Sequence, residues 1–186
     1  MSKILLDKED EWIALLMKAC EDGSKDIVEN LIKKGVNVNA KNEDGVTSLM
    51  IASLEGYNDI AEVLIKNGAD VNARDNDDWT ALIWASQDGH ICIAKCLIEN
   101  GADVNACEED GLTALMLAAQ NGHENMVKLL IKNGADIDAK DVDGRTALMI
   151  TQDARIRKII MNALGDKNIE KKSQLGEIIK NSFERG

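Results

Sequence analysis

The sequence predicts an all-α solenoid of about five 33-residue helix-turn-helix units joined by β-turn or hairpin connections. A short motif, written GVNVNA, GADVNA, GADVNA and GADIDA, begins at positions 35, 68, 101 and 134. Two further series keep the same spacing, and their members are Thr47, Thr80, Thr113 and Thr146 and Gly23, Gly56, Gly89 and Gly122. Self-similarity with a fixed period of this length is typical of solenoid proteins.

Each unit is predicted to open with a turn and a short first helix. An Asp-Gly pair such as Asp44-Gly45 favours a turn, and Thr47 after it can accept a hydrogen bond from the N–H groups at the start of a helix. The helix is expected to end at Gly56, because the residue just past a helix end often takes a left-handed conformation that glycine tolerates.

A second helix is predicted to follow at once in each unit. In the second unit Ile60, Val63, Leu64 and Ile65 recur at helical spacing, which indicates an apolar face that neighbouring helices must cover. The GAD segment then ends this helix, and its Asp and Asn residues favour the turn that leads to the next unit.

These motifs resemble the ankyrin-repeat family, whose units carry the pattern D-x-x-G-x-T-P-L-H-x-A-A-x-x-G-H followed by G-A-D-V-N-A. The match covers roughly residues 8 to 165. The resemblance implies an ankyrin-repeat domain over residues 1–165, with units at about 7–41, 42–74, 75–107 and 108–140 and a truncated unit at 141–165. Residues 166–186 are predicted to form a polar, net basic tail or a short capping helix.

The departures from the family pattern are local. Asp78 replaces the turn glycine of the third unit, and Asp tolerates a left-handed backbone better than most residues. Arg155 stands where the fifth unit should have its glycine, so we expect the array to end near Leu164. Met50, Met116 and Met149 share one helical register position and are predicted to fill the core.

Composition limits the partners that the chain can have. The formal net charge is -11, whereas binding to nucleic acid or an anionic membrane surface requires a basic patch. No segment is apolar over the length that a membrane helix needs. We expect a cytoplasmic monomer that binds neither nucleic acid nor membranes, with its four cysteines reduced.

No catalytic, cofactor or metal site is predicted. His90 and His123 are the only histidines, and the repeat explains both as hydrogen-bonding groups at the start of a second helix. Cys92 and Cys96 could share a helix face as metal ligands, but Cys96 aligns with the apolar Leu129, and the Cys-x-x-Cys spacing typical of structural zinc is missing.

Two tryptophans lie five residues apart in a chain with only three. Trp84 aligns with apolar residues in every unit, so it is predicted to belong to the core. Trp79 falls in the series Val46, Trp79 and Leu112, which precedes the capping threonines. In ankyrin repeats this position typically points to the concave side and contacts the partner. The resemblance therefore implies an exposed apolar stripe, with Trp as a favoured interface anchor; packing of one hairpin on the next is the alternative.

The resemblance also places a rim around the stripe. Its residues match the family's variable hairpin and first-helix positions, and they are Glu43, Asp44, Leu54, Glu55, Asn76, Asp77, Gln87, Asp88, Glu109, Asp110, Gln120 and Asn121. Most are acidic or amide side chains, so we expect a protein partner that carries a basic patch around an apolar knob.

The sequence thus predicts a non-catalytic protein-protein interaction module that binds its partner through the concave face and the hairpin tips. Three alternatives stay open at this point. The chain could be a secreted bacterial effector that binds host proteins, a chaperone-like companion of one enzyme, or a metal-dependent or enzymatic protein. The fold alone does not separate them.

Overall fold

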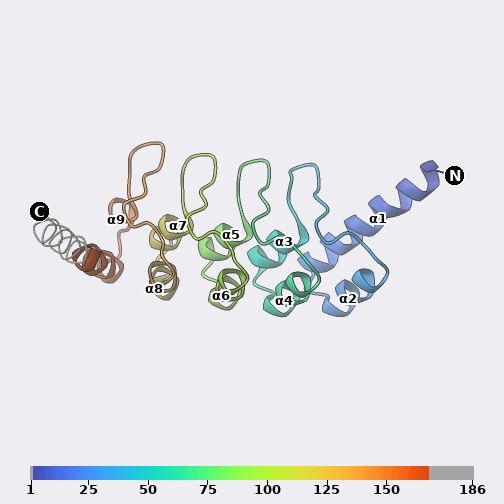
Figure 1. The fold of residues 1–186 in the computed structure, drawn as a ribbon, viewed down its shortest axis with the longest axis horizontal. Helices are drawn as coiled ribbons and strands as arrows, with labels where there is room; N and C mark the ends of the chain where they lie inside the picture. Colours follow the sequence, from blue (N-terminus) through green and yellow to red (C-terminus); the bar gives the residue numbers. More distant parts are fainter. Residues whose placement is uncertain (1, 168–186) are drawn as a thin grey trace, which may run out of the picture.

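The computed structural model describes residues 2–167, with side chains from residue 10 onward, and shows a row of stacked helix pairs (Figure 1). The inner row comprises α1 (Ser2–Glu21), α3 (Ser48–Glu55), α5 (Ala81–Gln87), α7 (Ala114–Gln120) and α9 (Ala147–Ile150). The outer row comprises α2 (Lys25–Lys33), α4 (Asn58–Lys66), α6 (Ile91–Glu99) and α8 (Glu124–Lys132), and a further helix covers 154–167. The predicted all-α solenoid is therefore confirmed.

The core runs through the stack from unit to unit. The inner helices contribute Leu49, Leu82 and Leu115, each at most 1% exposed, and each inner helix packs on the next inner helix and on its own outer helix. The outer helices contribute residues such as Ile60 and Ile93, which are equally buried. Because each unit covers the apolar face of its neighbour, stability depends on stacking.

The predicted helix signals lie where the local geometry needs them. The side chains of Thr47, Thr80 and Thr113 accept a hydrogen bond from the N–H three residues later. Gly56 ends α3 in the left-handed conformation at φ 81°. Asp78 takes the turn glycine's place with φ 63°, the only positive φ at a non-glycine residue among the described residues. Thr146 makes no such side-chain bond.

A hairpin finger precedes each inner helix from the second unit onward, and the fingers form a parallel row (Figure 1). Backbone hydrogen bonds join neighbouring fingers: Asn76 N–H donates to the Asp44 carbonyl at 2.9 Å, and Glu109 N–H donates to the Asp77 carbonyl at 3.1 Å. A third bond joins Val142 N–H to the Asp110 carbonyl at 2.9 Å. Each finger is thus hydrogen-bonded to the next along the whole row.

An asparagine ladder joins the loops on the other edge. Asn72 Nδ2 donates to the Gly101 carbonyl at 3.0 Å while its Oδ1 accepts the N–H of Asp103 at 2.8 Å, and the same pair of bonds recurs one unit before and one unit after. The fourth unit has Asp138 at this position, and its carboxylate pairs with Lys167 Nζ at 2.8 Å. An acidic residue therefore replaces the amide where no further GAD loop follows.

One packing prediction is wrong. Met149 is 68% exposed, whereas its repeat equivalents Met50 and Met116 are buried. The physical reason is that α9 has only four residues and that, within residues 2–167, no further inner helix follows to cover its outward face. Most of the predicted C-terminal tail, from residue 168 onward, lies outside the described residues. No helix within 2–167 combines the length and the apolar composition needed to cross a membrane.

Candidate functional site

The predicted apolar stripe lies at the base of the fingers. Val46, Trp79 and Leu112 are all half-buried and pack against the core, so each keeps only part of its side chain open to solvent. The backbone N–H of each donates to a side-chain oxygen of the residue four positions earlier, at 2.8, 2.8 and 2.7 Å respectively. The stripe is therefore held in place by the fingers themselves.

The two tryptophans pack on each other at the centre of the stripe. Their ring centroids lie 4.2 Å apart with the planes inclined by 31°. Trp84 is half-buried rather than fully buried, which corrects the simple core assignment, and its Nε1 is shielded from solvent without a hydrogen-bond partner in the described chain. Trp84 thus supports Trp79 from the inner helix and belongs in part to the same surface.

The structure brings the predicted rim together around this stripe on the fingers and at the ends of the inner helices. Two of the twelve rim residues, Leu54 and Gln87, are half-buried. The other ten are exposed, namely Glu43, Asp44, Glu55, Asn76, Asp77, Asp88, Glu109, Asp110, Gln120 and Asn121. Most of the rim side chains are therefore accessible to a partner.

Charge is sharply segregated between the two sides of the central units. The fingers and inner segments at 42–57, 75–90 and 108–123 contain no lysine or arginine. They contain ten acidic residues, namely Glu43, Asp44, Glu55, Asp75, Asp77, Asp78, Asp88, Glu108, Glu109 and Asp110. The outer segments 58–74 and 91–107 hold five acidic and three basic residues. The stripe therefore lies in a strongly negative field.

Sequence reasoning missed three acids of this surface. Asp75 and Glu108 lie at the finger bases, where their carboxylates accept backbone N–H groups, and Asp78 pairs with Arg74 at 3.5 Å. The recurrence of Asp75 and Glu108 33 residues apart, in register with Asn42, was the available signal for these two acids.

A polar hollow extends the surface at the C-terminal ends of α5 and α7. Its lining combines Gln87, Asp88, Gln120 and Asn121 from the rim with Leu117 and His123. Asn121 Nδ2 donates to the Gln87 carbonyl at 2.9 Å, which fixes the floor of the hollow. The hollow has room for a partner side chain, but no group in it is arranged for covalent chemistry.

Both histidines connect units. His90 Nε2 lies 2.9 Å from the Leu54 carbonyl, and His123 Nε2 lies 2.8 Å from the Gln87 carbonyl, so each ring bridges to the preceding inner helix with its Nε2 as donor. Each ring also lies against the glycine just past the first helix of the preceding unit: His90 lies against Gly56 and His123 against Gly89. In both cases the distance leaves no room for a Cβ atom on the glycine. These contacts support the structural role predicted for both histidines.

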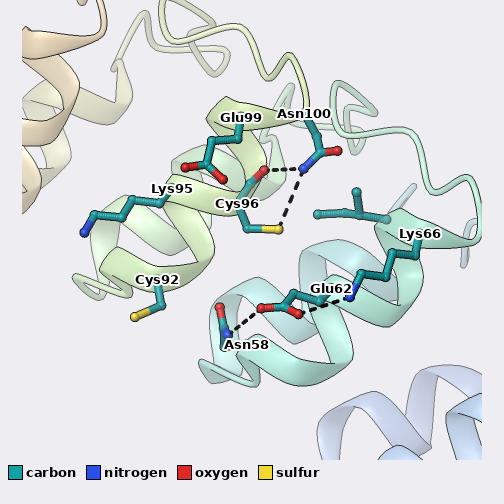
Figure 2. A pocket seen from close by; sticks show the side chains of 9 residues that line it. Asn58, Glu62, Lys66, Cys92, Lys95, Cys96, Glu99 and Asn100 are labelled. Carbon is teal, nitrogen blue, oxygen red and sulfur yellow. Dashed lines mark hydrogen bonds and ion pairs between the residues drawn. The ribbon is translucent and has the colours of Figure 1, made fainter.

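A groove on the opposite side runs between α4 and α6 (Figure 2). Cys92 is exposed, and Cys96 is half-buried rather than buried, as is its repeat equivalent Leu129. Burial raises the pKa of Cys96, with nearby Glu62 adding to the effect. Figure 2 shows the two sulfurs directed away from each other. Over the described residues, no three His, Cys, Asp or Glu side chains gather as a metal-binding group.

Similarity to known proteins agrees with this architecture. No curated protein sequence matches the chain significantly. A family model described as ankyrin repeats, in three copies, matches residues 2–75 and 82–174. These ranges include the described fingers and helix pairs, apart from residues 76–81 in the second finger and at the start of α5. The chain therefore belongs to the ankyrin-repeat family.

Proposed function

We propose that this protein is a non-catalytic binding module that holds a protein partner on the face formed by its fingers and inner helices. Ankyrin repeats are generally protein-protein interaction modules, and the family is typically non-catalytic. The observation that carries the proposal is the apolar stripe of Val46, Trp79 and Leu112 within segments 42–57, 75–90 and 108–123, which hold ten acidic residues and no lysine or arginine.

The stripe supplies the apolar contact of the interface. Because Trp79 rests on Trp84 and its backbone is fixed by the Asp75 carboxylate, it presents a preformed surface. Partners that meet a preformed surface lose less conformational entropy on binding, and large aromatic groups near the centre of an interface contribute strongly to affinity.

The acidic residues are expected to orient the partner and to raise its association rate. A partner with a basic patch around an apolar knob is attracted to this face over several ångströms and docks with its knob on the stripe. Screening shortens that range, since the Debye length is about 8 Å at physiological ionic strength. Association is therefore expected to slow as salt is raised, while the dissociation rate changes less.

The test is affinity capture from a lysate of the source cell with a matched set of baits. The stripe variant is Val46→Ser/Trp79→Ser/Leu112→Ser, and the control variant, Ile27→Ser/Met161→Ser, removes exposed apolar groups elsewhere on the molecule. Circular dichroism must show that both remain folded. We expect one partner to be held by the wild type and the control and lost by the stripe variant. Equal retention by all three baits would reject this face.

A further inference from the structure

Every finger is closed by one residue at its base. The four residues in this register are Asn42, Asp75, Glu108 and Asp141. In each case the side chain accepts hydrogen bonds from the backbone N–H groups two and four residues later, at 2.7–3.1 Å. The four fingers are therefore copies of one geometry with different side chains, and they can be compared directly.

In the last finger the chain's own arginine occupies this geometry. Arg145, which stands at the stripe position, donates from Nε to Asp141 Oδ2 at 2.7 Å and lies 3.2 Å from Asp143 through Nη2. Burial pushes the pKa of Asp141 upward, but the hydrogen bonds from Arg145 outweigh it and hold the pKa of this carboxyl below its usual range. The carboxylates of Asp141 and Asp143 are thus both paired with the guanidinium of Arg145.

The second finger has the same acid pair without the arginine. Asp75 and Asp77 are the repeat equivalents of Asp141 and Asp143, but the stripe position holds Trp79, which brings no cation. Asp75 Oδ1 closes the finger at 2.8 and 3.0 Å. Within the described chain, neither Asp75 Oδ2 nor the Asp77 carboxylate has a side-chain donor.

The nearest cation of this unit is committed elsewhere. Arg74 Nη1 donates to the Cys107 carbonyl at 2.9 Å and pairs with Asp78 at 3.5 Å. Both interactions lie outside the pair formed by Asp75 and Asp77.

The first and third fingers do not offer an equivalent pair. Asn42 is neutral. Glu108 uses both of its oxygens on its own backbone, at 2.7 and 3.1 Å, and is only 7% exposed. Of the four described fingers, the second alone combines two carboxylates in this register, an uncommitted oxygen at the base and no guanidinium of its own.

We propose that Asp75 and Asp77 form a socket for an arginine side chain of the protein partner. The inference rests on the proposed function and specifies the chemistry of its central contact. The planar guanidinium matches paired carboxylate oxygens, as Arg145 does in the last finger, and it stacks on an indole ring. Trp79 donates its backbone N–H to Asp75 Oδ1 and brings an indole ring into the same finger.

The test uses a phage-displayed library of random peptides, selected on the wild-type protein and counter-selected on the Val46→Ser/Trp79→Ser/Leu112→Ser variant. The enriched peptides are synthesised with each arginine intact or replaced by glutamine. The socket variant is Asp75→Asn/Asp77→Asn, which keeps the finger closed because Asn42 closes the first finger through the same two bonds. Glu29→Gln/Glu99→Gln is the control with the same loss of charge.

We expect stripe-dependent peptides to contain an arginine whose replacement weakens binding to the wild type and to the control by about tenfold or more. The same replacement should weaken binding to the socket variant by less than about twofold, because the coupled group is already gone. The socket would be overturned if the stripe-dependent peptides contained no arginine, or if replacing the arginine weakened binding equally to the wild type, the control and the socket variant. Either result would leave the proposed function intact. A selection that yields no stripe-dependent peptide would reject both.

Discussion

Ile27 and Ile93 occupy the same register in two outer helices but are buried to very different extents. Ile93 is 1% exposed because it packs between units, whereas Ile27 is 44% exposed at the open end of the array. Replacing a buried Ile by Ala costs roughly 2–5 kcal/mol of unfolding free energy. The Ile27 side chain keeps nearly half of its surface in water, so burial stabilises the wild type by only about half as much at this position. Ile27→Ala should therefore cost only about 1 kcal/mol of unfolding free energy.

The comparison is clean because both residues are the third of a nine-residue helix, so the gain in helix propensity on changing Ile to Ala is the same. Urea unfolding followed by far-ultraviolet circular dichroism measures both variants, provided that their m-values match the wild type. We expect Ile93→Ala to be the less stable by about 1–4 kcal/mol. Equal losses would refute the argument that stacking on the preceding unit buries this register position.

Three further outcomes follow from the structure. Gly56→Ala should destabilise the protein more than Gly134→Ala, because both need a positive φ but only the Cβ at Gly56 would lie 2.6 Å from the next unit's histidine ring; thermal melts decide. Asp141 has a lowered pKa in the folded state, so its contribution to stability is present above the unfolded pKa near 3.8 and is lost as the pH falls through the lower folded value. Asp141→Asn should therefore flatten acid unfolding below about pH 4, which urea midpoints against pH would show. Iodoacetamide at pH 8 should label the exposed Cys92 well before Cys20, whose pKa burial raises to about 12; mass spectrometry of digests reads the order.

Much of the fold could be predicted because each unit repeats the same local chemistry. The threonine and glycine series fixed helix starts and ends, and Asp78 could be assigned a left-handed backbone from its register alone. The ends of the array could not be read in the same way. Met149 has the same residue type and register as Met116. It is exposed because, in the described part of the chain, no further unit packs against α9. A period in sequence does not state where stacking stops.

The candidate surface was predictable in position but not in detail. Register alone places Trp79 beside the capping threonine, yet its packing against Trp84 depends on side-chain rotamers across the base of one inner helix. The proposed role of Asp75 in binding an arginine could not be predicted from the sequence either, since turn-forming acids are common in such loops. What distinguishes Asp75 from Asp141 is the partner of its second oxygen, and that is a property of three-dimensional geometry.

Variation among the chain's own units separates stacking from recognition. The register that packs between inner helices holds leucine at positions 49, 82 and 115, because the neighbouring unit leaves space for only that shape. The stripe register instead holds valine, tryptophan, leucine and arginine in four successive units, so stacking does not dictate its identity. The third unit departs furthest from the others there, with Trp79 and with Asp78 in place of the turn glycine. Selectivity for one partner over another should therefore depend most on this unit, which carries both the indole pair and the open acid pair.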